Sequence, residues 1–211
     1  MHAKTKSQYG QAGGSGKTPA DFRNATVQVV GISGSGKSFL LNAYFNTYNP
    51  RNFGLLEFGE RLREKANRAN REVHERDIHE LVEEIVSGNK PLVITSHMVY
   101  RRDDGSYTWN LEFDKLIASP AYVYISAEPI QILQQIKNDA SLKGMLRRDS
   151  PTTRMAVEAI AEHQELSLKK TLGACNLLRA DLLIIHNDPS RLQQNMETLN
   201  AYFNAYIRAT V

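Results

Sequence analysis

The sequence has little of what marks disulfide-rich, membrane-spanning or secreted proteins. Its 211 residues include one cysteine, Cys175, so no disulfide can form within the chain, and such sparse cysteine usage is typical of a reducing compartment. No run of 18 apolar residues occurs, which predicts that no helix spans a membrane. The segment Met1–Lys6 carries basic residues with no apolar stretch behind them. We therefore expect no secretory signal and a cytoplasmic protein.

A large excess of charge of one sign is also absent. The chain has 26 Lys and Arg residues against 23 Asp and Glu residues, a net charge of +3. Residues 1–25 hold four of the basic residues and one of the acidic residues, so the remaining chain is formally neutral. A neutral body argues against an extended nucleic-acid surface, because such a surface needs Lys and Arg along a line of phosphates.

Residues 1–25 also differ from the rest of the chain in composition. Gly, Ser and Gln dominate this segment, and no apolar periodicity occurs before Val27. We expect a flexible basic tail, followed by a single domain over residues 26–211.

Short apolar runs alternate with longer segments of helical periodicity after this tail. The predicted strands cover residues 26–30, 54–58, 91–96, 121–127 and 181–186. Two of them, around Val93 and Ile184, are continuously apolar, as strands buried on both faces should be. Helical spacing follows over residues 60–86 and 129–146, after Pro151 and after Pro189. The alternation predicts an α/β fold, with a five-stranded parallel sheet covered by helices on both faces.

The first strand leads directly into a glycine-rich loop and then into an apolar helix start. Together these residues complete the pattern G-x-x-x-x-G-K-[ST] in its required strand-loop-helix context. Glycines let backbone N–H groups approach phosphate oxygens, and the helix N-terminus adds its dipole. The predicted ATP-binding residues are Gly31, Ser33, Gly34, Ser35, Gly36, Lys37 and Ser38. Of these, Lys37 would reach the β- and γ-phosphates, and the hydroxyl of Ser38 would bind Mg²⁺.

A second, partial match lies in the tail at Gly13–Thr18. The first glycine of the pattern is replaced by Gln11, and no strand precedes the segment. We therefore interpret this partial match as part of a flexible Gly-Ser tail and not as a second phosphate loop.

The phosphate loop alone does not distinguish kinases, GTPases and ATPases. No N-K-x-D-like segment follows a later strand, which disfavours a GTPase. Four further segments follow the loop: Glu57–Arg63, Leu92–His97, Arg147–Asp149 and Ile160–Gln164. In order and spacing, the loop and these segments resemble nucleoside monophosphate kinases, most closely the archaeal type of adenylate kinase, over residues 26–205. The resemblance implies acceptor-site helices at about residues 59–87 and a short lid at about residues 143–154.

The resemblance also implies roles for particular side chains. Arg63 matches the arginine that holds the acceptor phosphate, and a guanidinium suits this role because it binds phosphate oxygens in a bidentate manner. His97 matches a substrate-side histidine, although a histidine at the end of an apolar strand is equally suited to a structural role. The lid arginines Arg147 and Arg148 would stabilise the transferring phosphoryl group, and Arg154 would join them.

One position departs from the family pattern. Thr95 stands where the family has an acidic residue that holds Mg²⁺ through water. A hydroxyl carries no charge, so efficient phosphoryl transfer is in question, and Glu57 at the end of a neighbouring strand is a possible substitute. Tyr107 and Trp109 lie beyond the third strand, where they would contact a nucleobase or pack on their own loop.

These observations favour an ATP- and Mg²⁺-dependent phosphotransferase that acts on a nucleoside monophosphate, with AMP as the first candidate. The expected partners are small nucleotides, and the sequence leaves the oligomeric state and the acceptor base open. The alternative is a nucleotide-binding switch or slow ATPase that has lost efficient transfer through Thr95 and acts on a macromolecule.

Overall fold

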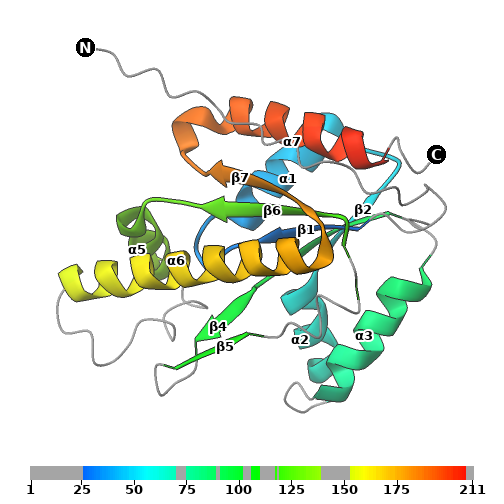
Figure 1. Ribbon diagram of the computed structural model, residues 1–211, viewed down its shortest axis with the longest axis horizontal. Helices are drawn as coiled ribbons and strands as arrows, with labels where there is room; N and C mark the ends of the chain where they lie inside the picture. The colour runs from blue at the N-terminus through cyan, green and yellow to red at the C-terminus, as the bar shows by residue number, and fades with distance from the viewer. Residues whose placement is uncertain are drawn as a thin grey trace.

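Five parallel strands form the central sheet, in the order β2-β3-β1-β6-β7 (Figure 1). The computed structural model describes residues 26–69, 75–88, 91–101, 106–109, 117, 119–138 and 153–207. The strands are β1 (Thr26–Val30), β2 (Gly54–Glu57), β3 (Leu92–Ser96), β6 (Ala121–Ser126) and β7 (Asp181–His186). The predicted fold class is therefore confirmed, and each of the five apolar runs forms a strand.

The strand boundaries differ from the predicted ones by one residue at three places. Phe58 was predicted as the last residue of the second strand, but it begins helix α2 (Phe58–Arg68). Its side chain packs with α2 and with α3 (Glu75–Ser87). Together these two helices account for most of the helical segment predicted over residues 60–86 and extend it by two residues at the start and one at the end. Pro91 and Ala127 lie just outside β3 and β6.

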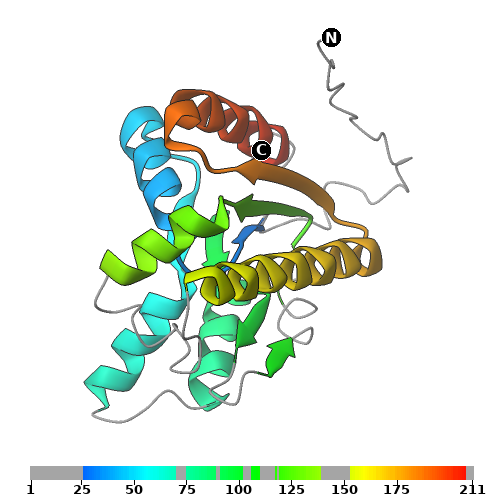
Figure 2. The ribbon, with the colours of Figure 1, turned by 90° about the vertical axis from the view of Figure 1, so that its left-hand side faces the viewer.

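Helices cover both faces of the sheet, as Figure 2 shows from its end. The helices α1 (Lys37–Tyr48) and α7 (Leu192–Ile207) pack against each other on one face. The long helix α6 (Thr153–Leu178) lies on the other face, and α5 (Pro129–Asn138) packs against α6. A short 3₁₀ helix, η3 (Pro189–Arg191), joins β7 to α7.

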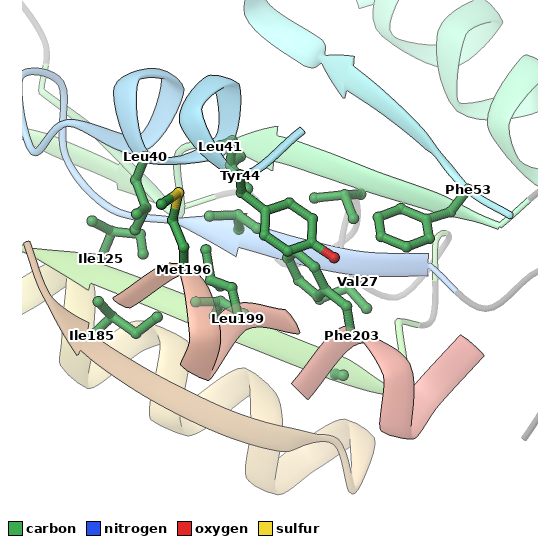
Figure 3. Packing of buried hydrophobic residues seen from close by; sticks show 14 residues of the cluster. Val27, Leu40, Leu41, Tyr44, Phe53, Ile125, Ile185, Met196, Leu199 and Phe203 are labelled. Carbon is green, nitrogen blue, oxygen red and sulfur yellow. The ribbon is translucent and has the colours of Figure 1, made fainter. Parts of the chain in front are cut away.

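The largest apolar cluster fixes α1 and α7 to the sheet (Figure 3). Leu40, Leu41 and Tyr44 of α1 meet Leu199 and Phe203 of α7 over the central strands, and all five are at most 1 % exposed. The Tyr44 and Phe203 rings meet edge to face, with centroids 5.2 Å apart. Burial of this size stabilises the fold by about 2 kcal/mol per side chain, so the cluster anchors the start of α1 firmly.

A two-stranded antiparallel hairpin lies beyond β3 and was not predicted as strands. It consists of β4 (Val99–Arg101) and β5 (Tyr107–Trp109). The Tyr107 ring lies 5.0 Å from that of His163 in α6, and the ammonium of Lys170 lies 4.5 Å from the Trp109 ring centroid. Both aromatic residues therefore pack against α6, and not on their own loop as one of the two predictions had it.

The topology marks one edge of the sheet as the place for a ligand. The chain leaves β1 towards β2 on one side, whereas β6 is followed by β7 on the other side. Connections that diverge in this way open a crevice at the carboxyl ends of neighbouring strands. Here the crevice lies between β1 and β6, and the glycine-rich loop emerges into it. In the described ranges, α6 is the longest helix but too polar to cross a bilayer, and no other helix there has the necessary length and apolar character.

Candidate phosphate-binding site

The loop between β1 and α1 has a backbone that only glycine accommodates at two points. Gly34 and Gly36 have φ angles of 78° and 81°, in the left-handed region that side chains disfavour. A Cβ at Gly36 would lie 2.1 Å from the Nδ2 atom of Asn187, and one at Gly31 would lie 2.4 Å from the Ile125 carbonyl oxygen. The glycines of the motif are thus required by the conformation and by close approach.

The side chain of Lys37 folds back over this loop. Its Nζ donates hydrogen bonds to the carbonyl oxygens of Gly31, at 2.8 Å, and Ile32, at 3.0 Å. Burial lowers the pKa of Lys37 from 10.5 to about 7, although the negative charge of Glu57 acts in the opposite direction. Two carbonyl partners compensate a buried ammonium poorly, and a phosphate bound in the loop would favour its charged form.

His97 joins the end of β3 to the same loop. Its Nδ1 lies 2.9 Å from the Gly31 carbonyl oxygen, and its Nε2 lies 3.4 Å from the Ser33 hydroxyl. Burial, followed by the charge of Lys37, lowers the pKa of His97 to about 3. The imidazole is therefore neutral, and because a carbonyl only accepts, we assign its proton to Nδ1.

Two amide side chains hold backbone near the site, one on the phosphate loop and one on the segment after β6, and neither was predicted to have a role. Asn187, just beyond β7, donates from Nδ2 to the carbonyl oxygen of Ser35 at 3.0 Å. Gln164 of α6 accepts from the Ala127 N–H at 3.1 Å and donates to the Ala127 carbonyl at 3.0 Å. A polar residue directly after a buried strand was the available signal for Asn187. Gln164 carried no such signal, because its partner is a backbone segment 37 residues away.

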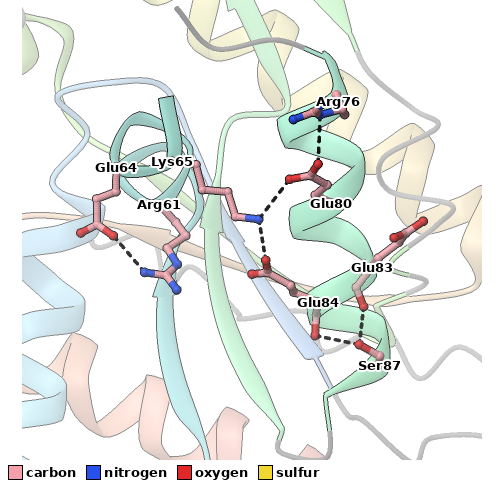
Figure 4. Close-up of polar contacts among 8 residues, drawn as sticks. All are labelled: Arg61, Glu64, Lys65, Arg76, Glu80, Glu83, Glu84 and Ser87. Carbon is pink, nitrogen blue, oxygen red and sulfur yellow. Dashed lines mark hydrogen bonds and ion pairs between the residues drawn. The ribbon is translucent and has the colours of Figure 1, made fainter. Parts of the chain in front are cut away.

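Most basic residues of α2 form ion pairs, and Figure 4 shows those of Arg61 and Lys65. Arg61 forms an ion pair with Glu64 at 3.0 Å, Arg68 approaches the same carboxylate at 3.9 Å, and Lys65 binds Glu80 and Glu84 of α3. These residues form a solvated surface network.

Arg63 is outside that network and makes none of its ion pairs. Its charge contributes to lowering the pKa of His97 and opposes the rise in the pKa of Glu60, so it lies within electrostatic reach of both. Arg63 is exposed, and its assignment to the acceptor phosphate stays a prediction.

Only one of the three predicted lid arginines lies among the residues that the structure describes. Arg147 and Arg148 lie outside the described residues, so their assignment stays a prediction. Arg154 lies in the first turn of α6, as expected, and its Nε binds Glu158 one turn later at 2.8 Å. Both side chains of this pair are exposed, and such pairs contribute less than about 1 kcal/mol, so the pair does not fix Arg154 in place.

Comparisons with known proteins identify the fold. No family model matches the sequence, and no curated protein matches it. Among solved structures, the shikimate kinase of Bacteroides thetaiotaomicron has a TM-score of 0.52 at 14 % identity, covering 85 % of this chain and 98 % of that one. The shikimate kinase of Acinetobacter baumannii, in complex with shikimate, has a TM-score of 0.51 at 12 % identity, covering 89 % and 98 %. The chain has the fold of the small P-loop kinases.

Proposed function

We propose that this protein is an ATP-dependent phosphotransferase whose acceptor is a nucleoside monophosphate, with AMP as the first candidate. The observation that carries the proposal is the position of Lys37, buried on the carbonyls of Gly31 and Ile32 in a complete phosphate loop. A lysine held there can exchange two carbonyl partners for phosphate oxygens with little movement of the loop.

The loop residues would bind and orient the triphosphate. The amides from Gly31 to Ser38 would contact the phosphates at the N-terminus of α1, and Lys37 would follow the charge that develops during transfer. Phosphoryl transfer depends on positioning and electrostatic stabilisation, because the acceptor phosphate is already an anionic nucleophile. Arg147 and Arg148 would add positive charge and exclude water as the lid closes.

Oxygen ligands around the loop suit Mg²⁺, which prefers hard donors. Ser38 is exposed in the first turn of α1. Glu57 is the last residue of β2, and its register partner Thr95 is the last residue but one of β3. When bound with ATP, Mg²⁺ would neutralise negative charge on the β- and γ-phosphates.

Arg63 would bind the phosphate of the acceptor nucleotide. Its position on α2, apart from the surface network and near His97, supports this role. The substrate role of His97 remains part of the proposal, beside its hydrogen bonds to the loop.

One observation favours a second function. Thr95 brings no negative charge to the end of β3, and without that charge phosphoryl transfer could be slow. A protein that binds ATP but transfers its phosphoryl group slowly would act as a switch or slow ATPase on a macromolecular partner. Two solved structures of similar fold are shikimate kinases, so a hydroxyl acceptor such as shikimate belongs in any test.

The test is to incubate the protein with Mg-ATP and each of AMP, CMP, GMP, UMP, dTMP and shikimate, and to resolve the products. We expect ADP and a nucleoside diphosphate, with AMP the best acceptor. Transfer to shikimate alone would keep the phosphotransferase and overturn the nucleotide acceptor. Binding of ATP without transfer to any of the six would leave the switch as the better function.

A matched pair of variants tests the loop assignment. Lys37→Ala should abolish transfer, whereas Lys169→Ala, which removes an exposed lysine of α6, should leave it unchanged. Circular dichroism would show that both variants fold.

A further inference from the structure

The residue at the end of β2 lies beside the one position at which the sequence departs from the family pattern. Glu57 and Thr95 are partners in the parallel register of β2 and β3, and Thr95 is in turn the partner of Val29 in β1. We propose that Glu57 supplies the carboxylate that holds the hydrated Mg²⁺ of the bound nucleotide, in place of an acidic residue at position 95. This inference rests on the proposed ATP site and is independent of the acceptor.

The pleat of the sheet determines which way these side chains point. Val29 and Val93 belong to the apolar cluster beneath α1, and Leu55 packs against it. Side chains two residues apart in a strand share a face, so Glu57 follows Leu55, and Thr95 follows Val93, onto the face that α1 covers.

The same face holds the start of α1. This helix begins at Lys37, whose Nζ lies on the loop carbonyls, and Ser38 is the next residue. Glu57 reaches this end of the sheet from β2, because it is the last residue of that strand and pairs with Thr95 in the register. A carboxylate at the carboxyl end of the sheet, on the face that α1 covers, lies on the side where the phosphates would meet Lys37 and Ser38.

The carboxylate of Glu57 has no competing structural task in its own helix. Glu57 is the N-cap residue of α2, but its side chain makes no capping hydrogen bond. It instead contacts the exposed carboxyl of Glu60, and this hydrogen bond is the main cause of the raised pKa of Glu60. Two neighbouring carboxylates repel each other, and a divalent cation bound beside them would relieve that repulsion.

The number of protein ligands near Glu57 determines whether Mg²⁺ can bind without a nucleotide. No group of three or more His, Cys, Asp or Glu side chains is close enough to hold a metal ion in the part of the chain that the structure describes. Mg²⁺ with one protein carboxylate needs phosphate oxygens to complete its shell. We therefore expect Mg²⁺ to bind together with the nucleotide and weakly without it.

The first measurement is the affinity for ADP by titration calorimetry, once with Mg²⁺ and once with EDTA. The second is the paramagnetic resonance spectrum of Mn²⁺ in the presence of ADP and the protein. In the wild type, Mg²⁺ should tighten ADP binding. Glu57→Gln should reduce that gain by about tenfold or more, as expected for loss of a supporting metal contact. The gain compares two affinities of the same protein, so an effect of Glu57 on Lys37 that is common to both conditions cancels. Glu60→Gln is the matched control and should keep at least half of the gain.

A double variant tests the exchange of roles between the two strands. Because positions 57 and 95 are register partners, Glu57→Gln with Thr95→Asp should restore the Mg²⁺ dependence and the Mn²⁺ spectrum. If Glu57→Gln fails to fold, Glu57→Asp should fold and show a smaller loss, since its carboxylate is withdrawn by one methylene.

The outcomes separate this inference from the proposed function. Wild-type Mg²⁺ dependence in Glu57→Gln, or in Glu57→Asp if that variant is the one that folds, would overturn the role of Glu57 and leave the ATP site intact. An unrestored double variant would also count against it. Absence of ADP and ATP binding in the wild type, with or without Mg²⁺, would instead overturn the proposed function itself.

Discussion

The Nδ1 atom of His97 lies 2.9 Å from the carbonyl oxygen of Gly31, which also accepts a hydrogen bond from Lys37 at 2.8 Å. One carbonyl at the start of the phosphate loop therefore has two donors in the ligand-free protein. If Lys37 turns to a phosphate, His97 still satisfies the carbonyl, and the loop need not change shape. This arrangement suggests that His97 stabilises the loop in addition to any contact with substrate.

Replacing His97 tests that role. His97→Leu should weaken ATP binding by about fivefold, which is the value of about 1 kcal/mol for a lost hydrogen bond. His97→Asn should lose less, because its amide can still donate towards Gly31. Fluorescent-nucleotide titration measures the ATP affinity, and steady-state kinetics measure KM for AMP. A change confined to KM for AMP would show that His97 contacts the acceptor and does not support the loop.

Lys37 should make ATP binding depend on pH. Its pKa in the ligand-free protein is about 7, and a bound triphosphate should raise it, so the protein takes up a proton on binding above pH 7. Affinity should fall by up to about tenfold per pH unit between pH 7.5 and 9. Calorimetry in buffers of different ionisation enthalpy would measure the proton uptake.

Lys37→Arg provides the control for this pH dependence. A guanidinium stays charged throughout the range, so the variant should bind ATP more weakly but with no slope above pH 7.5. An equal slope in both proteins would place the titrating group elsewhere.

The two arginines of α2 should differ in their effect on the acceptor. Arg63→Ala should raise KM for AMP by about 10- to 100-fold, as expected for loss of a charge-assisted hydrogen bond, with ATP affinity unchanged. Arg61→Ala removes only an exposed ion pair with Glu64 and should change KM by less than about twofold. Steady-state kinetics at saturating ATP compare the two, and equal effects would contradict the assignment of Arg63.

Gln164 should contribute to stability more than its half-buried position suggests. Its amide satisfies both the N–H and the carbonyl of Ala127, so Gln164→Ala should lower the free energy of unfolding by about 2 kcal/mol. The matched control is Gln193→Ala, because Gln193 is exposed on α7 and its amide binds only Glu197 one turn away. Urea denaturation of both variants measures the difference, and equal midpoints would show that water replaces the Gln164 contacts.

Local patterns were enough to predict the strands and the strand-loop-helix context of the phosphate loop. Continuous apolar runs identify buried strands, and the glycine spacing reflects backbone angles at Gly34 and Gly36 that no other residue adopts as readily. The hairpin of β4 and β5 was harder to foresee, because its strands have three residues each and are held by contacts with α6. The contacts of Asn187 and Gln164 with the loop and with Ala127 were likewise hidden, since their partners are 152 and 37 residues away.

The sequence by itself determined the sheet, its two-sided cover and the place of the phosphate loop, because these follow from hydrophobic periodicity and from backbone angles that act over a few residues. Only the tertiary structure decided how side chains from separate strands meet there. Parallel register placed Glu57 beside Thr95, and the fold brought His97 to the carbonyl of Gly31. These contacts depend on which strands are neighbours in the sheet, and the packing of the whole sheet determines that order.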